Sequence, residues 1–271
     1  MIFFCEILQC LVVFSVASVP GNIFLLGSTK NSSLQGLHAS GNLAFVKDFE
    51  SVFQQQDNER SRARCSDTLT VDSWSCAGAY LAMSSSSPLS DRGVWRQVWE
   101  QQVELLITFV SSSTKDDLAL FSSSKFIGSY QLQLEAEKEM GDYIVRTLKM
   151  RNRGTTRTVT QLVFMSWPTA PGLTPTKSSF MSLIRESSEQ MRARQVSGPV
   201  MVWSGADLGW DPVIAWMSLD TMSRQMSHTG DTNLSHYTRY LALTPGLQLT
   251  NSHVYIQLHD MLAWAIQNNK L

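Results

Sequence analysis

The sequence predicts an α/β fold in which a central, twisted mixed sheet is flanked by helices. Along the 271 residues, segments with helical hydrophobic spacing alternate with short segments that are apolar throughout or alternate with period two. This order is typical of helices packed around a sheet in one domain. Hydrophobic residues make up 43% of the chain, and the formal net charge is only −1. The charge therefore gives no reason to expect nucleic acid or an anionic membrane as a partner.

Two helices are predicted in the first half of the chain. Residues 37–53 are expected to be helical because Phe45, Phe49 and Phe53 recur at every fourth position. Residues 92–102 are expected to form the second helix. Its apolar face consists of Val94, Trp95, Val98 and Trp99.

The predicted strands fall in the middle of the chain. The apolar run at 103–110 is typical of a strand buried on both faces. Residues 129–137 and 142–150 alternate with period two around the turn "KEMG", which indicates a hairpin. Two further strands are expected at 158–167 and 198–203.

The chain is expected to end in helices. They are predicted at 174–194, 211–226, 232–243 and 250–266. We expect Asp211 to cap the second of these, with Pro212 in its first turn. The last helix has a buried stripe of Val254, Leu258, Met261, Leu262 and Ala265.

The N-terminal segment, residues 1–36, is treated apart from the domain predicted at 37–271. Its apolar stretch at 7–19 is too short to span a bilayer, so no membrane span is predicted. A small-residue site follows it, as in a secretory signal, but the preceding residues include Glu6 and no Lys or Arg. A signal, a packed segment and a truncated start all remain open.

No metal or cofactor site is predicted. The four cysteines, Cys5, Cys10, Cys65 and Cys76, form no CxxC pair, which argues against a zinc site or a disulfide scaffold. The five histidines are scattered singly. Asp207 and Asp211 could be two metal ligands, but no third ligand is visible, and capping accounts for Asp211.

The stretch "PVMVWSGADLGWDP" at 199–212 has the layout of an anion site. A strand leads through a glycine-bearing loop into a helix, and a helix N-terminus directs N–H groups and a positive dipole end at one point. However, the stretch contains no Cys, Lys, Arg or His. An anion cradle is therefore predicted without a nucleophile or a cation.

An ordered set of motifs resembles the protein tyrosine phosphatases. These are "VWRQVWEQQVELLITFV", "YIVRTLKM", "TVTQLVFMSWP", "SGPVMV" and "LHDMLAWAI", and the resemblance covers roughly residues 40–268. It implies a tyrosine-phosphatase-like fold. The family's strand region is almost absent between Asp67 and Tyr80, so we expect the early part of the sheet to be shortened.

The resemblance also implies where the catalytic groups should be. Active members of the family carry His-Cys, five residues and then Arg after the Val-rich strand. Here the loop contains Trp203, Ser204, Asp207 and Gly209. One alignment puts Trp203 at the nucleophile and Gly209 at the Arg, and another shifts this by a few residues. In either case no Arg lies between 194 and 224 and no Cys follows 76.

Other family positions are altered as well. The general-acid Asp is replaced by Thr169, which cannot protonate a leaving phenolate near neutral pH. The water-positioning glutamines fall at Thr250 and Val254, and the segment that stacks phosphotyrosine looks like 62–65, without an aromatic residue. Asp207 and Asp211 oppose a bound dianion electrostatically.

Packing is the simpler interpretation of the remaining loop side chains. We interpret Trp203 and Trp210 as hydrophobic filler of a vacated pocket. Ser204 lacks the flanking glycines of a hydrolase nucleophile, because Val202 and Ala206 stand there.

The sequence therefore predicts a catalytically inactive phosphatase-like domain that acts as an interaction or regulatory module and binds a protein partner. "LTPGLQL" and "WPTAPGL" resemble the inactive second domains of receptor-type members, which implies a cytoplasmic location and possible membrane association. The alternatives are a hydrolase with a rearranged site and a truncated product without function.

Overall fold

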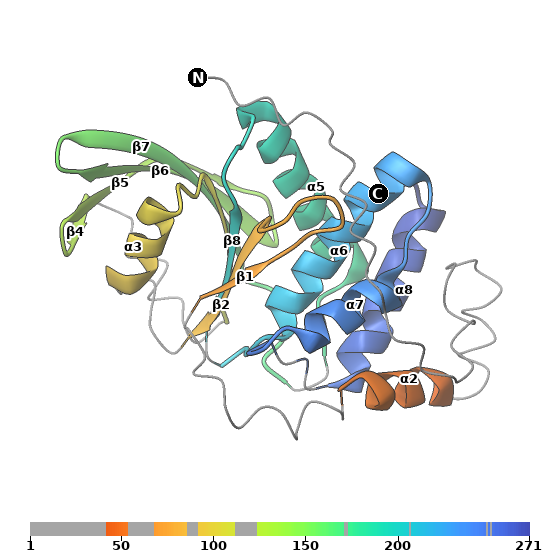
Figure 1. Ribbon diagram of the computed structural model, residues 1–271. Coiled ribbons are helices and arrows are strands. Elements are labelled where there is room, and N and C mark those ends of the chain that lie inside the picture. The colour runs from red at the N-terminus through yellow and green to blue at the C-terminus, as the bar shows by residue number, and fades with distance from the viewer. Residues whose placement is uncertain are drawn as a thin grey trace.

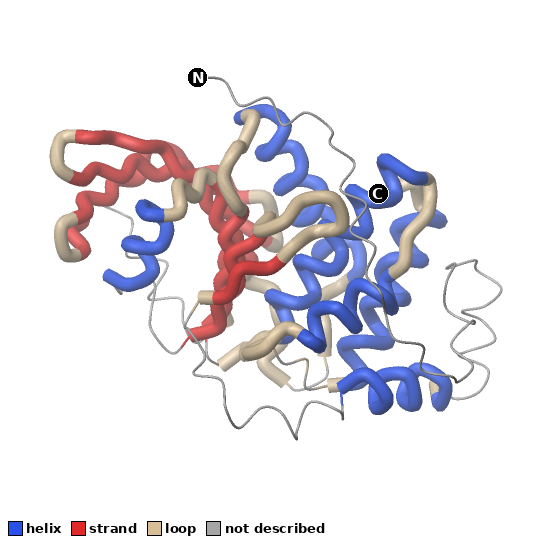
Figure 2. Tube along the Cα trace, in the orientation of Figure 1, coloured by secondary structure: helices blue, strands red, loops and turns tan. Residues whose placement is uncertain are grey.

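The computed structural model describes residues 42–53, 68–85, 92–111, 124–170, 173–205, 207–247, 249 and 251–271. The predicted N-terminal segment, residues 62–65 and Thr250 lie outside these ranges. An eight-stranded sheet runs through the molecule, and most of the helices gather on one side of it (Figures 1 and 2). This confirms the predicted α/β class with a mixed sheet flanked by helices.

The strand order is β1-β2-β8-β3-β7-β6-β5-β4. The strands are β1 (Leu69–Val71), β2 (Tyr80–Ser85), β3 (Leu105–Phe109), β4 (Lys125–Ile127), β5 (Tyr130–Glu139), β6 (Tyr143–Asn152), β7 (Thr155–Phe164) and β8 (Val200–Gly205). Strands β2, β8, β3 and β7 pair in parallel, and the remaining pairs are antiparallel. The centre of the sheet is therefore parallel, and β8 lies inside it between β2 and β3.

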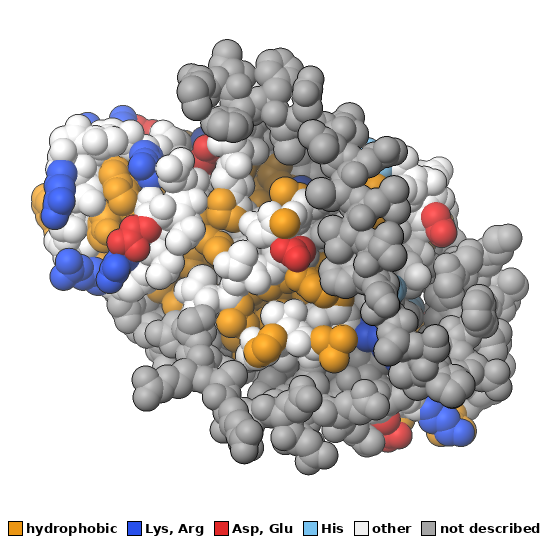
Figure 3. All heavy atoms as spheres, in the orientation of Figure 1, with side chains coloured by type: hydrophobic (Ala, Val, Ile, Leu, Met, Phe, Trp, Pro, Cys, Tyr) orange, Lys and Arg blue, Asp and Glu red, His pale blue; other side chains and the backbone are white. Residues whose placement is uncertain are grey.

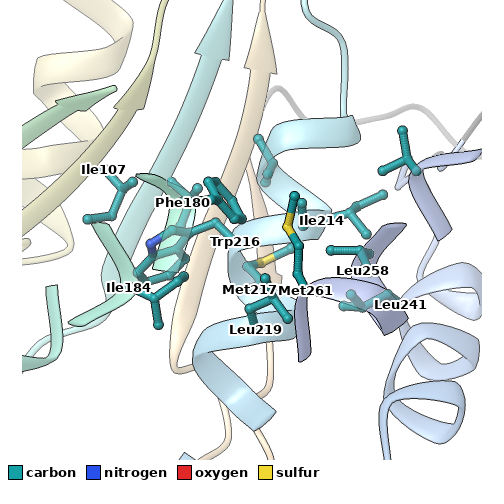
Figure 4. Close-up of a cluster of buried hydrophobic side chains, with 14 of the residues drawn as sticks. Ile107, Phe180, Ile184, Ile214, Trp216, Met217, Leu219, Leu241, Leu258 and Met261 are labelled. Carbon is teal, nitrogen blue, oxygen red and sulfur yellow. The ribbon is translucent and has the colours of Figure 1, made fainter. Parts of the chain in front are cut away.

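Helices cover the two faces of the sheet unequally. They are α2 (Leu43–Phe53), α3 (Arg92–Glu100), α5 (Lys177–Arg194), α6 (Asp211–Thr229), α7 (Leu234–Leu243) and α8 (Ser252–Gln267). The main core joins the sheet to α5–α8 and α2, whereas a second, smaller core joins the other face to α3. In Figure 4, Ile107 of β3, Phe180 of α5 and Trp216 of α6 lie together in the main core.

Several predicted elements are confirmed. All five residues of β3 are buried, as expected for a strand with parallel neighbours on both sides. The hairpin of β5 and β6 forms across the predicted turn. The predicted stripe of α8 is buried along its whole length.

The early sheet region differs from the expectation in detail. No strand was predicted before residue 103, yet β1 and β2 form an antiparallel pair that completes this edge of the sheet. Strand β1 is short, with three residues. The brief run 80–83 was missed because it is followed by serines at 84–87 and lacks a clear period. Pairing with β8 in parallel supplies the partner that such a weak strand needs.

The start of α5 and the capping of α6 also differ from the expectation. Helix α5 begins at Lys177, with Thr176 as its extended N-cap, so the predicted start at Thr174-Pro175 was too early. Helix α6 begins at Asp211 with Trp210 as its N-cap, so Asp211 is not the cap. It lies instead in the first turn, where its negative charge interacts favourably with the positive end of the helix dipole.

Helix α6 is the central helix of the main core. Every residue from Pro212 to Met222 is buried, because neighbours surround this half of the helix on all sides. Within the described ranges, no helix combines the length and the apolarity needed to cross a bilayer.

Candidate functional site

The candidate site is the connection from β8 to α6. Strand β8 ends at the carboxyl edge of the parallel part of the sheet, and its chain continues through a short loop into the N-terminus of α6. In open α/β sheets, ligands bind at this edge. The structure therefore places the predicted loop where an anion site would form.

Trp203 lies on the α3 face of the sheet, and the tip of its indole reaches the start of this loop, because Cη2 is 3.9 Å from the position that a Cβ would take at Gly205. It is 1% exposed and belongs to the second core, on the α3 face of the sheet, together with Val94 and Trp95. Its neighbour Val202 belongs to the main core, as strand alternation requires. Trp203 thus fills space in the core on the side opposite α6. That it fills a pocket vacated by the family's catalytic groups stays a prediction.

Ser204 closes the loop with a hydrogen bond. The side chain is buried, and its Oγ donates to the carbonyl oxygen of Gly209 across 2.5 Å. The N–H of Leu208 donates to the carbonyl oxygen of Gly205 at 3.1 Å, and Leu208 is buried in the main core. The loop is therefore held by its own side chains and by the core.

Gly205 and Gly209 are subject to different constraints. A Cβ at Gly205 would lie 2.7 Å from Oδ1 of Asp207, because this carboxylate folds back over the glycine. Gly209 has open space around it but a φ of 61°, the left-handed region that other residues rarely adopt. Asp207 itself is exposed, so the loop presents a negative charge to solvent.

Thr169 lies in the loop that follows β7, two residues after the buried Trp167. Trp167 is 5% exposed and packs against Phe109 and Phe180, with ring centroids 5.8 Å and 5.5 Å away. Two residues later Thr169 is exposed, and it makes no side-chain hydrogen bond among the described residues. The structure therefore does not join Thr169 to the loop after β8.

A buried polar cluster lies further along α6, and sequence reasoning missed it. Asp220 is fully buried, and its Oδ2 accepts hydrogen bonds from the hydroxyl of Tyr80 at 2.6 Å and from Nε of Arg224 at 2.9 Å. The Tyr80 hydroxyl is also 3.0 Å from Oγ1 of Thr221. Burial raises the pKa of Asp220, although Arg224 and Tyr80 oppose the shift.

This cluster joins α6 to β2, and the tyrosines of α7 extend it. Burial raises the pKa of Tyr80 well above its ordinary value. The hydroxyl of Tyr237 donates to the backbone oxygen of Asp72 at 2.8 Å, and Tyr240 Oη accepts from the N–H of the same residue at 3.1 Å. The "LDT" at 219–221 was visible in the sequence, but its partners lie some 140 positions away.

The described residues offer little for a cofactor or a metal. No three His, Cys, Asp or Glu side chains among them gather as a metal ion would require. Cys76 is exposed in the connection between β1 and β2 and is the last cysteine of the sequence. In the described part of the loop after β8, the polar side chains are the buried hydroxyl of Ser204 and the exposed carboxylate of Asp207.

Comparison with known proteins agrees with this fold. The sequence pattern of the family described as protein-tyrosine phosphatase matches residues 79–264, which is more than half of the chain. The chain is 24% identical over 211 residues to the rat receptor-type tyrosine-protein phosphatase zeta, covering 72% of this chain and 9% of that protein. It is 23% identical over 213 residues to the Drosophila melanogaster tyrosine-protein phosphatase 99A, covering 74% and 16%.

A non-receptor relative is similar to about the same degree. The human tyrosine-protein phosphatase non-receptor type 7 is 22% identical over 188 residues, which cover 68% of this chain and 51% of that protein. The matches to the rat and Drosophila proteins thus span only a small part of those proteins. The match over 79–264, which is more than half of the chain, leads to one conclusion: this chain belongs to the protein-tyrosine phosphatase family.

Proposed function

We propose that this chain is a phosphatase-family domain without phosphatase activity that acts as an interaction or regulatory module in phosphotyrosine signalling. The loop after β8 carries this proposal. Family chemistry needs a thiolate that attacks phosphorus and an Arg that grips the phosphoryl oxygens. Between residues 199 and 212 the sequence contains neither Cys nor any cationic side chain.

The geometry of the loop supports the proposal from a second direction. The buried hydroxyl of Ser204 already donates a hydrogen bond to the carbonyl oxygen of Gly209. The exposed Asp207 would repel a phosphate dianion at the same place. A loop whose buried hydroxyl is already bonded and whose exposed side chain is negative is poorly suited to binding phosphate.

The general-acid position gives independent support. Thr169 replaces a carboxylic acid that would protonate the leaving group, and a hydroxyl of ordinary acidity cannot do so near neutral pH. Restoring one group would leave the other steps without their residues. We therefore propose that the domain functions by binding other proteins through its surface and not by catalysis.

The location that we propose is the cytoplasmic side of a receptor-type protein, in the role of a second phosphatase domain. The rat relative named as receptor-type supports this assignment, because the match to it covers 72% of the chain. The proposed partner is a protein, such as a phosphatase domain or another signalling protein.

The test is an activity measurement on the purified chain. We expect no hydrolysis of phosphotyrosine peptides or aryl phosphates above that of a matched blank purification. The Ser204→Ala variant should give the same trace as the wild type. Turnover that follows the protein through purification and is abolished in this variant would overturn the proposal and establish a hydrolase with a rearranged site.

A further inference from the structure

A pocket of about 480 Å³ opens between α5 and α6. Its α6 residues are Ser223, Arg224, Ser227 and His228, in the C-terminal half of the helix. At a rise of about 1.5 Å per residue, they lie roughly 20 Å along α6 from the loop after β8. The pocket is therefore separate from the candidate site described above.

Helical spacing brings cationic side chains into this pocket. Arg185 and Arg192 of α5 are seven positions apart and share one face of that helix. Arg224 of α6 lines the facing wall, and Lys270 lines the pocket from the segment after α8. Four cations thus enter the pocket from three parts of the chain.

Two of these four charges are already matched. Nε of Arg224 lies 2.9 Å from Oδ2 of the buried Asp220, and Nε of Arg185 lies 3.8 Å from Oε1 of Glu189. Arg192 and Lys270 are exposed, and neither forms an ion pair among the described residues. The pocket therefore has two unmatched positive charges.

Two apolar side chains of α5, Ile184 and Met191, also line the pocket. Ile184 is 1% exposed and Met191 is partly buried against the main core. A compact phosphate would need several donors converging on one point. Here Arg192 and Lys270 stand on separate elements, and apolar side chains also line the pocket, which suits an extended ligand with spaced carboxylates and an apolar side chain between them.

We propose that this pocket binds an acidic peptide segment of a partner protein. Carboxylates of the segment pair with Arg192 and Lys270, and an apolar side chain contacts Ile184 and Met191. The inference rests on the proposed role as an interaction domain and names the class of partner that one surface of the domain recognises.

The direct test uses the full chain and a short fluorescent peptide in which Glu and Leu alternate. We expect saturable binding in an anisotropy titration, and weaker binding when the salt concentration rises from about 50 mM to about 300 mM, because exposed charge pairs are screened. The matched peptide with Gln in place of Glu should bind at least about tenfold more weakly. Equal binding of the two peptides would overturn the proposal.

Two double variants locate the binding. Arg192→Glu with Lys270→Glu should weaken binding by about tenfold or more. Arg151→Glu with Arg153→Glu makes the same change of charge on the exposed hairpin of β6 and β7, where Lys and Arg side chains also gather (Figure 3), and should leave binding unchanged. If the hairpin variant loses as much affinity as the pocket variant, the attraction is unspecific and the proposal is wrong.

Further controls keep the result decisive. If charge reversal prevents folding, Arg192→Gln with Lys270→Gln should still weaken binding while keeping the melting temperature. Displacement of the peptide by millimolar inorganic phosphate or a phosphotyrosine peptide would assign the pocket to phosphate instead. Phosphatase turnover would overturn the proposed function but would leave the peptide-binding measurement unaffected. If the acidic peptide does not bind, only the inference about this pocket is overturned.

Discussion

The hydroxyl of Tyr80 on β2 donates to Oδ2 of Asp220 on α6 across 2.6 Å, in the interior of the protein. The other carboxylate oxygen, Oδ1, is buried without a hydrogen-bond partner among the described residues. Arg224 supplies the compensating charge at 2.9 Å. The carboxylate of Asp220 therefore links β2, whose sequence has no clear strand period, to α6, the central helix of the core.

Removing this carboxylate should destabilise the fold strongly. We expect Asp220→Ala to lower the free energy of unfolding by about 3–5 kcal/mol, because it leaves the Arg224 charge and the Tyr80 hydroxyl without their partner. Urea unfolding measures the change. Glu189→Ala is the control, since it breaks an exposed ion pair of 3.8 Å and should cost less than about 1 kcal/mol. Equal losses of unfolding free energy in the two variants would show that the pair at Asp220 stabilises the fold no more than the exposed pair does.

The same carboxylate should make stability depend on pH. Burial raises the pKa of Asp220 above its ordinary value of 3.8, so the folded protein holds this proton more tightly than the unfolded chain does. The contribution is therefore fully present below about pH 4 and is lost as the pH rises through the folded pKa.

The comparison that isolates this effect is with Asp220→Asn, which cannot titrate. As the pH rises from about 4, the stability of the wild type should fall relative to that of the variant, in urea unfolding at successive pH values. A wild type that instead gains stability over the variant across this range would mean that the pKa of Asp220 is lowered in the folded protein.

Vanadate and phosphate should not stabilise the protein. A ligand at a hundredfold excess over its Kd adds about 2.7 kcal/mol to the stability of the folded state, which a thermal melt resolves easily. The loop after β8 offers an exposed Asp207 and no cation, so we expect no change in Tm at millimolar anion. A clear rise in Tm that Gly209→Ala removes would show that the loop still binds anions.

Restoring two family residues should not restore activity. In Trp203→Cys with Gly209→Arg, the new thiol would replace an indole that packs on the α3 face of the sheet, and the new Arg would stand at a φ of 61°. Loss of the buried indole should cost about 3–5 kcal/mol. We expect a destabilised variant without burst-phase phosphoenzyme.

The exposed Trp74 provides the control for that variant, since Trp74→Cys removes the same side chain from a position that is 42% exposed and should cost much less. Burst-phase formation of a phosphoenzyme by the double variant would contradict the proposal that the loop has become a packing element.

The sequence by itself predicted the elements whose pattern is local. The uninterrupted apolar run of β3, the period-two hairpin of β5 and β6 and the helical stripe of α8 each repeat over enough residues to identify their structure. The loop after β8 could be located as well, because a strand, two glycines and a proline follow one another within 199–212. The lack of Cys and Arg there is likewise a property of the sequence alone.

Tertiary structure decided what depends on distant partners. Strand β2 forms because it pairs in parallel with β8, about 120 positions further along the chain. No local hydrophobic period in the sequence predicts it. The side of the sheet on which Trp203 lies follows from strand register, since a shift of one residue would turn it toward α6. The link from Tyr80 to Asp220, and the four cations of the α5–α6 pocket, form only when separate elements are packed together, because the energy of each contact depends on neighbours that the linear sequence keeps apart.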